Sequence, residues 1–213
     1  MNTDIFTEEK KENDIYGKYR SNMEFVMNDM EKRLELFDAE IYESSGEHIF
    51  EHVNCRIKSE ESIREKCKKK DLPVTTESAL KVIKDSIGIR IVCAFVDDVY
   101  RIIEHIRGMY NCHVVEEKDY ITHAKSNGYR SYHMILEVET PLPDCYEQIP
   151  GHYYIEVQLR TIAMDTWASL EHKVRYKKDI KSGKMIEDEL KRCSDELASC
   201  DISMMTIRNL IKE

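Results

Sequence analysis

We predict an α+β fold for this 213-residue sequence from three of its features. Residues 153–160 alternate apolar and polar side chains, which is the two-residue period of a strand with one buried face. Residues 85–95 are rich in Ile and Val, the residue types that strands favour. Between Tyr19 and Ile41, apolar side chains recur every three or four positions, which indicates an amphipathic helix. Helices are therefore expected to flank a β-sheet.

Residues 1–45 are expected to form an N-terminal helical region that ends at the breaker Ser44-Ser45-Gly46. One face of this helix carries the apolar stripe Tyr19, Met23, Val26, Met30, Leu34, Phe37 and Ile41. A second helix is expected to start after Ser59, a residue type that caps helix N-termini, and to stop before Pro73.

Residues 46–180 are expected to form the central domain. After the strand at 85–95, Asp97 is expected to cap an amphipathic helix. The inward residues of that helix are Val99, Ile102, Ile103, Ile106 and Tyr110. Strands over residues 129–139 and 153–160 follow, separated by a Pro-rich loop.

Two more helices are expected after the last strand. The first runs from Thr161 to about Tyr176, with Trp167 and Leu170 in the core. The second lies within residues 181–213 and carries a heptad seam, which consists of Ile186, Leu190, Cys193, Leu197, Cys200, Met204, Ile207 and Ile211. Such a seam fits either a helix that lies on its own domain or one that pairs with another copy. Its narrowness favours self-association.

The composition limits the class of protein. A hydrophobic content of 41% and a charged content of 34% describe a soluble globular protein, and no apolar run approaches the ~20 residues of a membrane span. The N-terminus lacks the apolar core of a signal peptide, so a cytoplasmic protein is expected. Seven cysteines without a CxxC pair indicate reduced thiols rather than a disulfide or zinc framework. The net charge of −9 disfavours broad nucleic-acid binding, so any anion site must be a local basic pocket.

The polar face of the strand at 153–160 is the strongest indication of a functional site. Its side chains are Tyr154, Glu156, Gln158 and Arg160. Packing of a core gives no reason to align a carboxylate, an amide and a guanidinium on one side of a strand. Asp85 stands at the start of another strand, and two strand-borne carboxylates brought together commonly hold Mg²⁺ beside substrate phosphates.

Asp85 leaves two questions open. Taken alone, it fits an ordinary turn residue between a helix and a strand. It also has the opposite parity to Arg90 along the chain. Both side chains can face one ligand only if Gly88 marks a bulge, or if Asp85 precedes the regular strand pairing.

Two further groups of residues suit nucleotide binding. Arg56, Lys58, Ser62 and Lys66 gather around a helix N-terminus, where they fit either a grip on a triphosphate or a solvated basic face. Lys118, Lys125 and Asn127 lead into Tyr129. An exposed Tyr after a turn offers a stacking surface for a purine, although a Tyr at a strand start also fits core packing. His133, on the same face, favours the binding interpretation.

Five motifs in this order resemble the synthetase domain of the RelA/SpoT homologues, and in particular the stand-alone small alarmone synthetases of the RelQ type. They are RIKSEESIREK (56–66), DSIGIRI (85–91), NGYRSYH (127–133), EVQLRT (156–161) and WASLEHK (167–173). The resemblance covers roughly residues 15–205. The sequence contains neither a Walker loop nor a GxGxxG element, so a P-loop or Rossmann site is not expected.

The resemblance implies a nucleotidyltransferase-like fold with a mixed sheet of about five strands. It also implies transfer of the β,γ-pyrophosphate of ATP to the ribose 3′-hydroxyl of GTP or GDP, which yields (p)ppGpp, the stringent-response alarmone, and AMP. Residues 46–180 would be the catalytic core and 181–213 an oligomerisation helix, since such enzymes form homotetramers. The chain has no His-Asp dipeptide and no room for the hydrolase domain of longer homologues, so a synthetase alone is expected.

The resemblance also implies a role for each candidate residue. Arg56 and Arg90 would sandwich adenine, and the ATP phosphates would contact Lys58, Ser62 and Lys66. Asp85 and Glu156 would hold Mg²⁺, with Glu156 also acting as base toward the attacking hydroxyl. Tyr129 would stack on guanine. Around the rest of the acceptor nucleotide would lie Lys118, Lys125, Asn127, His133, Gln158 and Asp165.

Two departures from the family pattern concern the acceptor. His123-Ala124 precedes Lys125 where relatives often show Asn-Pro, and Asp165 stands where relatives commonly carry Asn. An Asp can still accept hydrogen bonds from guanine N1–H and its amino group.

Two rival functions are a toxin-like relative that pyrophosphorylates tRNA 3′ ends and a non-catalytic nucleotide- or RNA-binding scaffold. Single-stranded RNA stays open as a regulator, and no membrane partner is expected.

Overall fold

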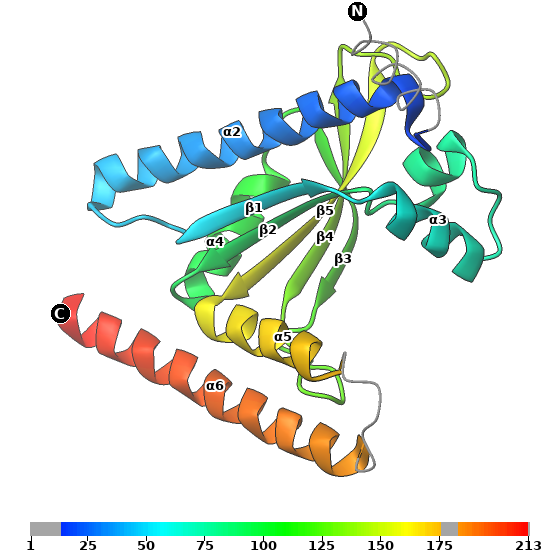
Figure 1. Ribbon diagram of the computed structural model, residues 1–213. Helices are drawn as coiled ribbons and strands as arrows, with labels where there is room; N and C mark the ends of the chain where they lie inside the picture. Colours follow the sequence, from blue (N-terminus) through cyan, green and yellow to red (C-terminus); the bar gives the residue numbers. More distant parts are fainter. Residues whose placement is uncertain (1–13, 176–182, 213) are drawn as a thin grey trace, which may run out of the picture.

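A computed structural model describes residues 14–175 and 183–212, in which one mixed five-stranded sheet is the central element (Figure 1). The strands are β1 (His52–Ile57), β2 (Ile87–Cys93), β3 (Cys112–Asp119), β4 (Tyr132–Thr140) and β5 (Gly151–Thr161). Their order is β1-β2-β5-β4-β3, and only β2 and β5 run parallel. The predicted α+β class with a mixed sheet is confirmed.

Helices surround this sheet. They are η1 (Gly17–Tyr19), α2 (Arg20–Ser45), α3 (Glu60–Lys69), η2 (Ser78–Val82), α4 (Val96–Arg107), α5 (Ile162–Arg175) and α6 (Gly183–Lys212). Helices α2 and α4 pack on one face of the sheet, while α5 follows directly from the end of β5 and lies along α6 (Figure 1).

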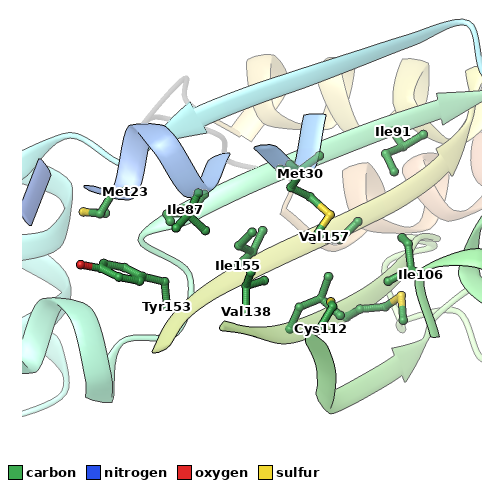
Figure 2. Packing of buried hydrophobic residues seen from close by; sticks show 14 of the residues in the cluster. Met23, Met30, Ile87, Ile91, Ile106, Cys112, Val138, Tyr153, Ile155 and Val157 are labelled. Atoms are coloured by element: carbon green, nitrogen blue, oxygen red, sulfur yellow. The ribbon is translucent and has the colours of Figure 1, made fainter. Parts of the chain in front are cut away.

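Strand alternation separates an apolar face from a polar one. In β2, Ile87, Ile89 and Ile91 are almost fully buried, and in β5 the same holds for Ile155 and Val157 (Figure 2). Because successive side chains of a strand point to opposite faces, the residues between them are directed to the other side of the sheet. The core therefore fixes which side chains form the polar face.

The predicted helical signals of the N-terminal half are confirmed. In α2, Met23, Val26, Met30 and Leu34 are buried, and the helix ends at Gly46, whose φ of 74° gives the left-handed C-cap. Ser59 caps α3, since its side chain accepts a hydrogen bond from the Ser62 N–H.

Several expected positions differ from the structure. Tyr110 is 83% exposed because α4 ends at Arg107, and Leu170 is 53% exposed whereas Trp167 beside it in α5 is buried. Asp97 lies in the first turn of α4 rather than at its N-cap, where Phe95 stands. Strand β4 begins at Tyr132, so Tyr129 belongs to the loop that precedes it.

The apolar seam of α6 differs in burial between the two halves of the helix. Toward its N-terminal half, Leu190 and Leu197 are half-buried, and Trp167 of α5 donates a hydrogen bond to the Leu190 carbonyl over 2.7 Å. Toward the other end, Ile207 is 49% and Ile211 78% exposed. The seam thus lies partly on its own domain and leaves an apolar end uncovered by the described residues.

No helix of the described chain is apolar over the length needed to cross a membrane. All seven cysteines are free thiols in the structure.

Replacing Asp144 with Ala is expected to lower the free energy of unfolding by about 3 kcal/mol. The Asp144 side chain is 1% exposed and lies 2.5 Å from Nζ of Lys81, which is itself only 13% exposed. The change would leave a buried ammonium unpaired, and backbone N–H groups of Tyr146 and Gln148 would lose their acceptor. Urea unfolding measures the loss, with Glu189→Ala as the control because its ion pair with Arg192 is exposed. Equal losses of unfolding free energy in Asp144→Ala and Glu189→Ala would contradict the stabilising role given to the buried Asp144–Lys81 pair.

Candidate active site

A pocket of about 250 Å³ lies on the polar face, over strands β1, β2 and β5. Register places Arg56 of β1 opposite Gly88 of β2, and Gly88 opposite Glu156 of β5. Because glycine has no side chain, the floor between Arg56 and Glu156 stays open. The polar residues that line this pocket are Asn54, Arg56, Lys58, Asp85, Arg90, Glu156 and Gln158.

Asp85 reaches this pocket because it precedes the regular pairing of β2. The strand begins at Ile87, and Gly88 pairs in register on both sides, so no bulge is present there. Asp85 and Arg90 therefore line the same pocket in spite of their opposite parity. The sequence allowed either a bulge at Gly88 or a position of Asp85 before the regular strand pairing, and the structure confirms the position before the pairing.

Two lysines hold the Asp85 carboxylate. Nζ of Lys58 donates to Asp85 Oδ2 over 2.6 Å, and Nζ of Lys66 donates to the same oxygen. The other oxygen, Oδ1, is buried without a hydrogen-bond partner among the described residues. Burial alone would raise the pKa of Asp85, but the hydrogen bonds from Lys58 and Lys66 outweigh it and lower the pKa. Asp85 is therefore ionised at neutral pH.

Glu156 is likewise held as a carboxylate. Gln158 Nε2 donates to Glu156 Oε2 over 2.9 Å, and His133 Nδ1 lies 3.6 Å from Oε1. Burial acts to raise the pKa of Glu156, yet the contacts with His133 and Gln158 lower it overall, against the repulsion of Asp85. The two acids are thus close enough to interact, and both are charged at neutral pH.

The donor set of this pocket fits Mg²⁺. The ion prefers oxygen ligands and commonly uses one or two carboxylates together with substrate phosphates and water. Asp85 and Glu156 supply two carboxylates, and Oδ1 of Asp85 is a buried acceptor to which no described residue donates. No group of three or more His, Cys, Asp or Glu side chains suited to a metal occurs within residues 14–175 and 183–212. Ligands beyond these two acids would have to come from substrate and water.

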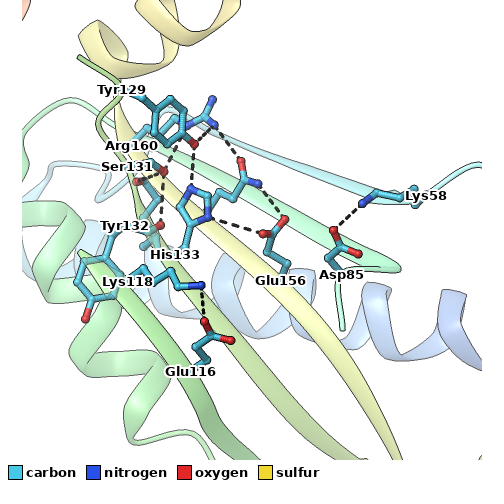
Figure 3. A network of polar contacts seen from close by, with 12 residues as sticks. Lys58, Asp85, Glu116, Lys118, Tyr129, Ser131, Tyr132, His133, Glu156 and Arg160 are labelled. Carbon is cyan, nitrogen blue, oxygen red and sulfur yellow. Dashed lines mark hydrogen bonds and ion pairs between the residues drawn. The ribbon is translucent and has the colours of Figure 1, made fainter. Parts of the chain in front are cut away.

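A closed ring of polar contacts joins Glu156 to Tyr129 (Figure 3). The Tyr129 hydroxyl lies 2.8 Å from His133 Nε2 and accepts from Arg160 Nη2 over 2.7 Å. The same Arg160 nitrogen donates to Gln158 Oε1 over 2.9 Å, and Gln158 in turn donates to Glu156. His133 closes the ring. The carboxylate and the aromatic side chain are therefore fixed relative to each other.

The sequence pattern places Arg160 on this face but predicts no role for it. Its side chain is 7% exposed, and Nη1 donates to Asp165 Oδ1 over 2.9 Å. Asp165 also lies 3.5 Å from Arg90 Nε, between guanidinium groups of β2 and β5. The strict alternation of β5 was the only signal for Arg160, because its partners at 129 and 165 belong to other elements.

Lys125, Asn127 and Lys118, which were predicted to bind the acceptor, make different contacts near Tyr129. The Lys125 ammonium lies 4.8 Å from the centroid of the Tyr129 ring, within cation–π range. The Asn127 side chain accepts the Tyr129 N–H over 3.1 Å, so it shapes the turn. Lys118 pairs with Glu116 beside His133 on the sheet, and its side chain is 55% exposed.

The structure thus groups most of the predicted site residues into two halves. Lys58 and Lys66 surround Asp85, and Arg56 and Arg90 line the same pocket. Around Glu156 lie Tyr129, His133, Gln158 and Asp165, connected through Arg160. Ser62 is exposed, and its hydroxyl accepts a hydrogen bond from the Ser59 hydroxyl at the N-terminus of α3.

Comparison with known proteins identifies relatives along most of the chain. The family described as a region found in RelA / SpoT proteins matches residues 55–181. The GTP pyrophosphokinase YwaC of Bacillus subtilis is 35% identical over 184 residues, which is 86% of each chain. The GTP pyrophosphokinase YjbM of the same organism is 34% identical over 176 residues, 81% of this chain and 79% of the relative.

Solved structures of small alarmone synthetases are similar to this chain over most of its length. Small alarmone synthetase 1 from Bacillus subtilis, bound to its product pppGpp, superposes with a TM-score of 0.76 at 28% identity and covers 90% of this chain and 95% of its own. Small alarmone synthetase 2 from that organism gives a TM-score of 0.75 at 33% identity and covers 88% and 94%.

Proposed function

The chain belongs to the RelA/SpoT family, and on that premise we propose that it is a GTP pyrophosphokinase. It transfers the β,γ-pyrophosphate of ATP to the ribose 3′-hydroxyl of GTP or GDP and forms (p)ppGpp and AMP. The observation that carries this proposal is the convergence of Asp85 and Glu156 on one pocket, between the lysines at 58 and 66 and the ring that ends at Tyr129. The two relatives compared above, YwaC and YjbM, are GTP pyrophosphokinases.

On the donor side, ATP occupies the pocket over β1 and β2. Arg56 and Arg90 present planar guanidinium groups that stack on the adenine ring. Lys58 and Lys66 neutralise Asp85 in the structure and contact the phosphates when the triphosphate is present. Asp85 and Glu156 would hold Mg²⁺, which would supply further positive charge against the repulsion between the two nucleotides.

On the acceptor side, Tyr129 stacks on guanine and Glu156 receives a proton. The 3′-hydroxyl oxygen attacks the β-phosphorus of ATP, the bond from that phosphorus to the oxygen shared with the α-phosphate breaks, and AMP leaves. The hydroxyl proton passes to the Glu156 carboxylate, which its neighbours keep ionised. Phosphoryl transfer depends mainly on positioning and charge. The contact ring from Tyr129 to Glu156 therefore aids the reaction by holding the guanine-stacking side chain and the base in a fixed relative position.

Incubation with Mg²⁺, γ-labelled ATP and either GTP, GDP or GMP tests the proposal. Label on the guanosine product together with one AMP per transfer is the expected result. Label on tRNA supplied in a parallel reaction, with none on free nucleotides, would favour the toxin-like rival. Nucleotide binding without AMP would favour a non-catalytic scaffold.

We further propose that the enzyme is a cytoplasmic homotetramer assembled through α6. Reduced thiols suit the cytoplasm, and an exposed apolar end of α6 suits a partner helix. Ile207→Asp is expected to reduce the mass in light scattering from about four chains to fewer, because a carboxylate in an apolar interface is costly. Tyr110→Asp is the control, since Tyr110 is exposed after α4. A single-chain mass of 25.2 kDa for the unaltered protein at micromolar concentration would overturn the proposal.

A further inference from the structure

The loop that carries Tyr129 is packed against α6. The Ser194 hydroxyl donates to the carbonyl oxygen of Gly128, and both residues are buried. A Cβ on Gly128 would lie 2.7 Å from Ser194 Cβ and 3.1 Å from Lys191 Cα. Gly128 also has a φ of 92°, which an L side chain rarely adopts. Only glycine allows the loop to approach α6 this closely.

The residue on the other side of Tyr129 is held by the same helix. Arg130 Nη2 donates to Asp195 Oδ1 of α6 over 3.3 Å, and Arg130 Nη1 donates to the Ile121 carbonyl over 2.9 Å. Both neighbours of Tyr129 in the chain are therefore anchored to one turn of α6, at Ser194 and Asp195.

A third connection passes through α5. Trp167 Nε1 donates to the Leu190 carbonyl of α6 over 2.7 Å. The Trp167 ring meets the Tyr129 ring edge-on, with 6.2 Å between centroids and 61° between planes. Residues 190–195 of α6 thus contact Tyr129's two neighbours and the tryptophan beside its ring.

We infer that α6 is part of the acceptor site and that Ser194 is a positioning residue for Tyr129. The inference rests on the proposed function, in which Tyr129 stacks on guanine. Ser194 does not touch the nucleotide in this account. It fixes the Gly128 carbonyl, and thereby the backbone that aims the Tyr129 ring, before the acceptor binds. A ring held in place in advance loses less freedom on binding, so the acceptor binds more tightly.

A purely structural role for Ser194 predicts a different result. If Ser194 only stabilised the fold, its replacement would lower the unfolding temperature and would affect ATP and the guanosine nucleotide alike. Positioning of Tyr129 predicts a selective rise in the KM for the acceptor. A displacement of about 1 Å in a positioned group can cost up to about a hundredfold in rate.

The test compares Ser194→Val and Ser194→Ala with the exposed control Ser199→Ala. Within residues 14–175 and 183–212, the Ser199 hydroxyl bonds only to the Asp195 carbonyl of its own helix, over 3.0 Å. Valine removes the hydrogen bond and adds bulk where Gly128 leaves no space, so we expect about a tenfold rise in KM for GTP or GDP and less than a twofold change for ATP. Alanine removes only the hydrogen bond, and about a threefold selective rise is expected. Ser199→Ala should match the unaltered enzyme.

Trp167 gives a second readout that does not depend on turnover, because it is the only tryptophan of the chain. Its fluorescence, titrated with GDP in the absence of ATP, should yield a Kd that is weakened in the Ser194 variants by the same factor as KM. If Ser194→Val does not fold, Ser194→Ala decides the matter. Unchanged acceptor KM and Kd in Ser194→Ala, or an equal rise for ATP, would overturn the inference. Absence of guanosine binding and of product in the unaltered enzyme would instead overturn the proposed function.

Discussion

Replacing Glu156 with Gln is expected to reduce (p)ppGpp formation at least about a thousandfold while both nucleotides still bind. The amide has almost the same shape as the carboxylate and can keep the contact with Gln158, which is 2.9 Å away. It cannot accept the hydroxyl proton, and it is a poor ligand for Mg²⁺. General-base catalysis alone is worth about 10²–10⁴-fold, and loss of a metal ligand adds to that.

The measurement is single-turnover formation of labelled product at saturating ATP, GTP and Mg²⁺, together with the Kd for GDP from Trp167 fluorescence. Glu137→Gln is the matched control. Glu137 of β4 lies on the same face of the sheet as Glu156 of β5, opposite Tyr154, whose hydroxyl donates to it over 2.6 Å. That change should leave turnover within about twofold. Turnover of Glu156→Gln within tenfold of the unaltered enzyme would refute both roles assigned to Glu156.

The sequence predicted the polar face because side chains of β5 alternate between buried and half-buried from Gly151 to Leu159. Glu156 and Gln158 therefore fall on the predicted side, and Asp85 reaches them from the turn before β2. The edge strands were harder to predict. In β3, a bulge between Val114 and Glu116 interrupts the alternation on which such a prediction depends, and β1 was not among the strands predicted from the sequence pattern.

The contacts that organise the acceptor half were not predictable from local patterns. Arg160 meets Tyr129 across 31 positions of the chain, and Ser194 meets Gly128 across 66. Periodicity assigns a residue to a face of its own element but does not identify its partners on other elements. For the same reason, Tyr110 and Leu170 were placed in the core although the helix end and the packing direction expose them.

Replacing Asp85 with Asn is the second change with a large expected effect, about a hundredfold or more on turnover. The Asp85 carboxylate accepts from both Lys58 and Lys66, and its buried Oδ1 has no donor in the part of the chain that the structure describes. Asparagine keeps the shape but removes the charge that attracts Mg²⁺. The concentration of Mg²⁺ needed for half-maximal turnover should therefore rise at least about tenfold.

The same change should strengthen ATP binding when Mg²⁺ is absent. Without the Asp85 charge, the ammonium groups of Lys58 and Lys66 are free to meet phosphates instead of a carboxylate. Equilibrium binding of ATP in EDTA, measured beside Mg²⁺ titrations of turnover, separates loss of the metal from loss of the fold, because a misfolded pocket would bind ATP less tightly. Asp71→Asn is the matched control, since Asp71 has a φ of 57° in an exposed turn, a conformation that Asn also tolerates. An unchanged Mg²⁺ requirement in Asp85→Asn would mean that the metal is held by Glu156 without Asp85.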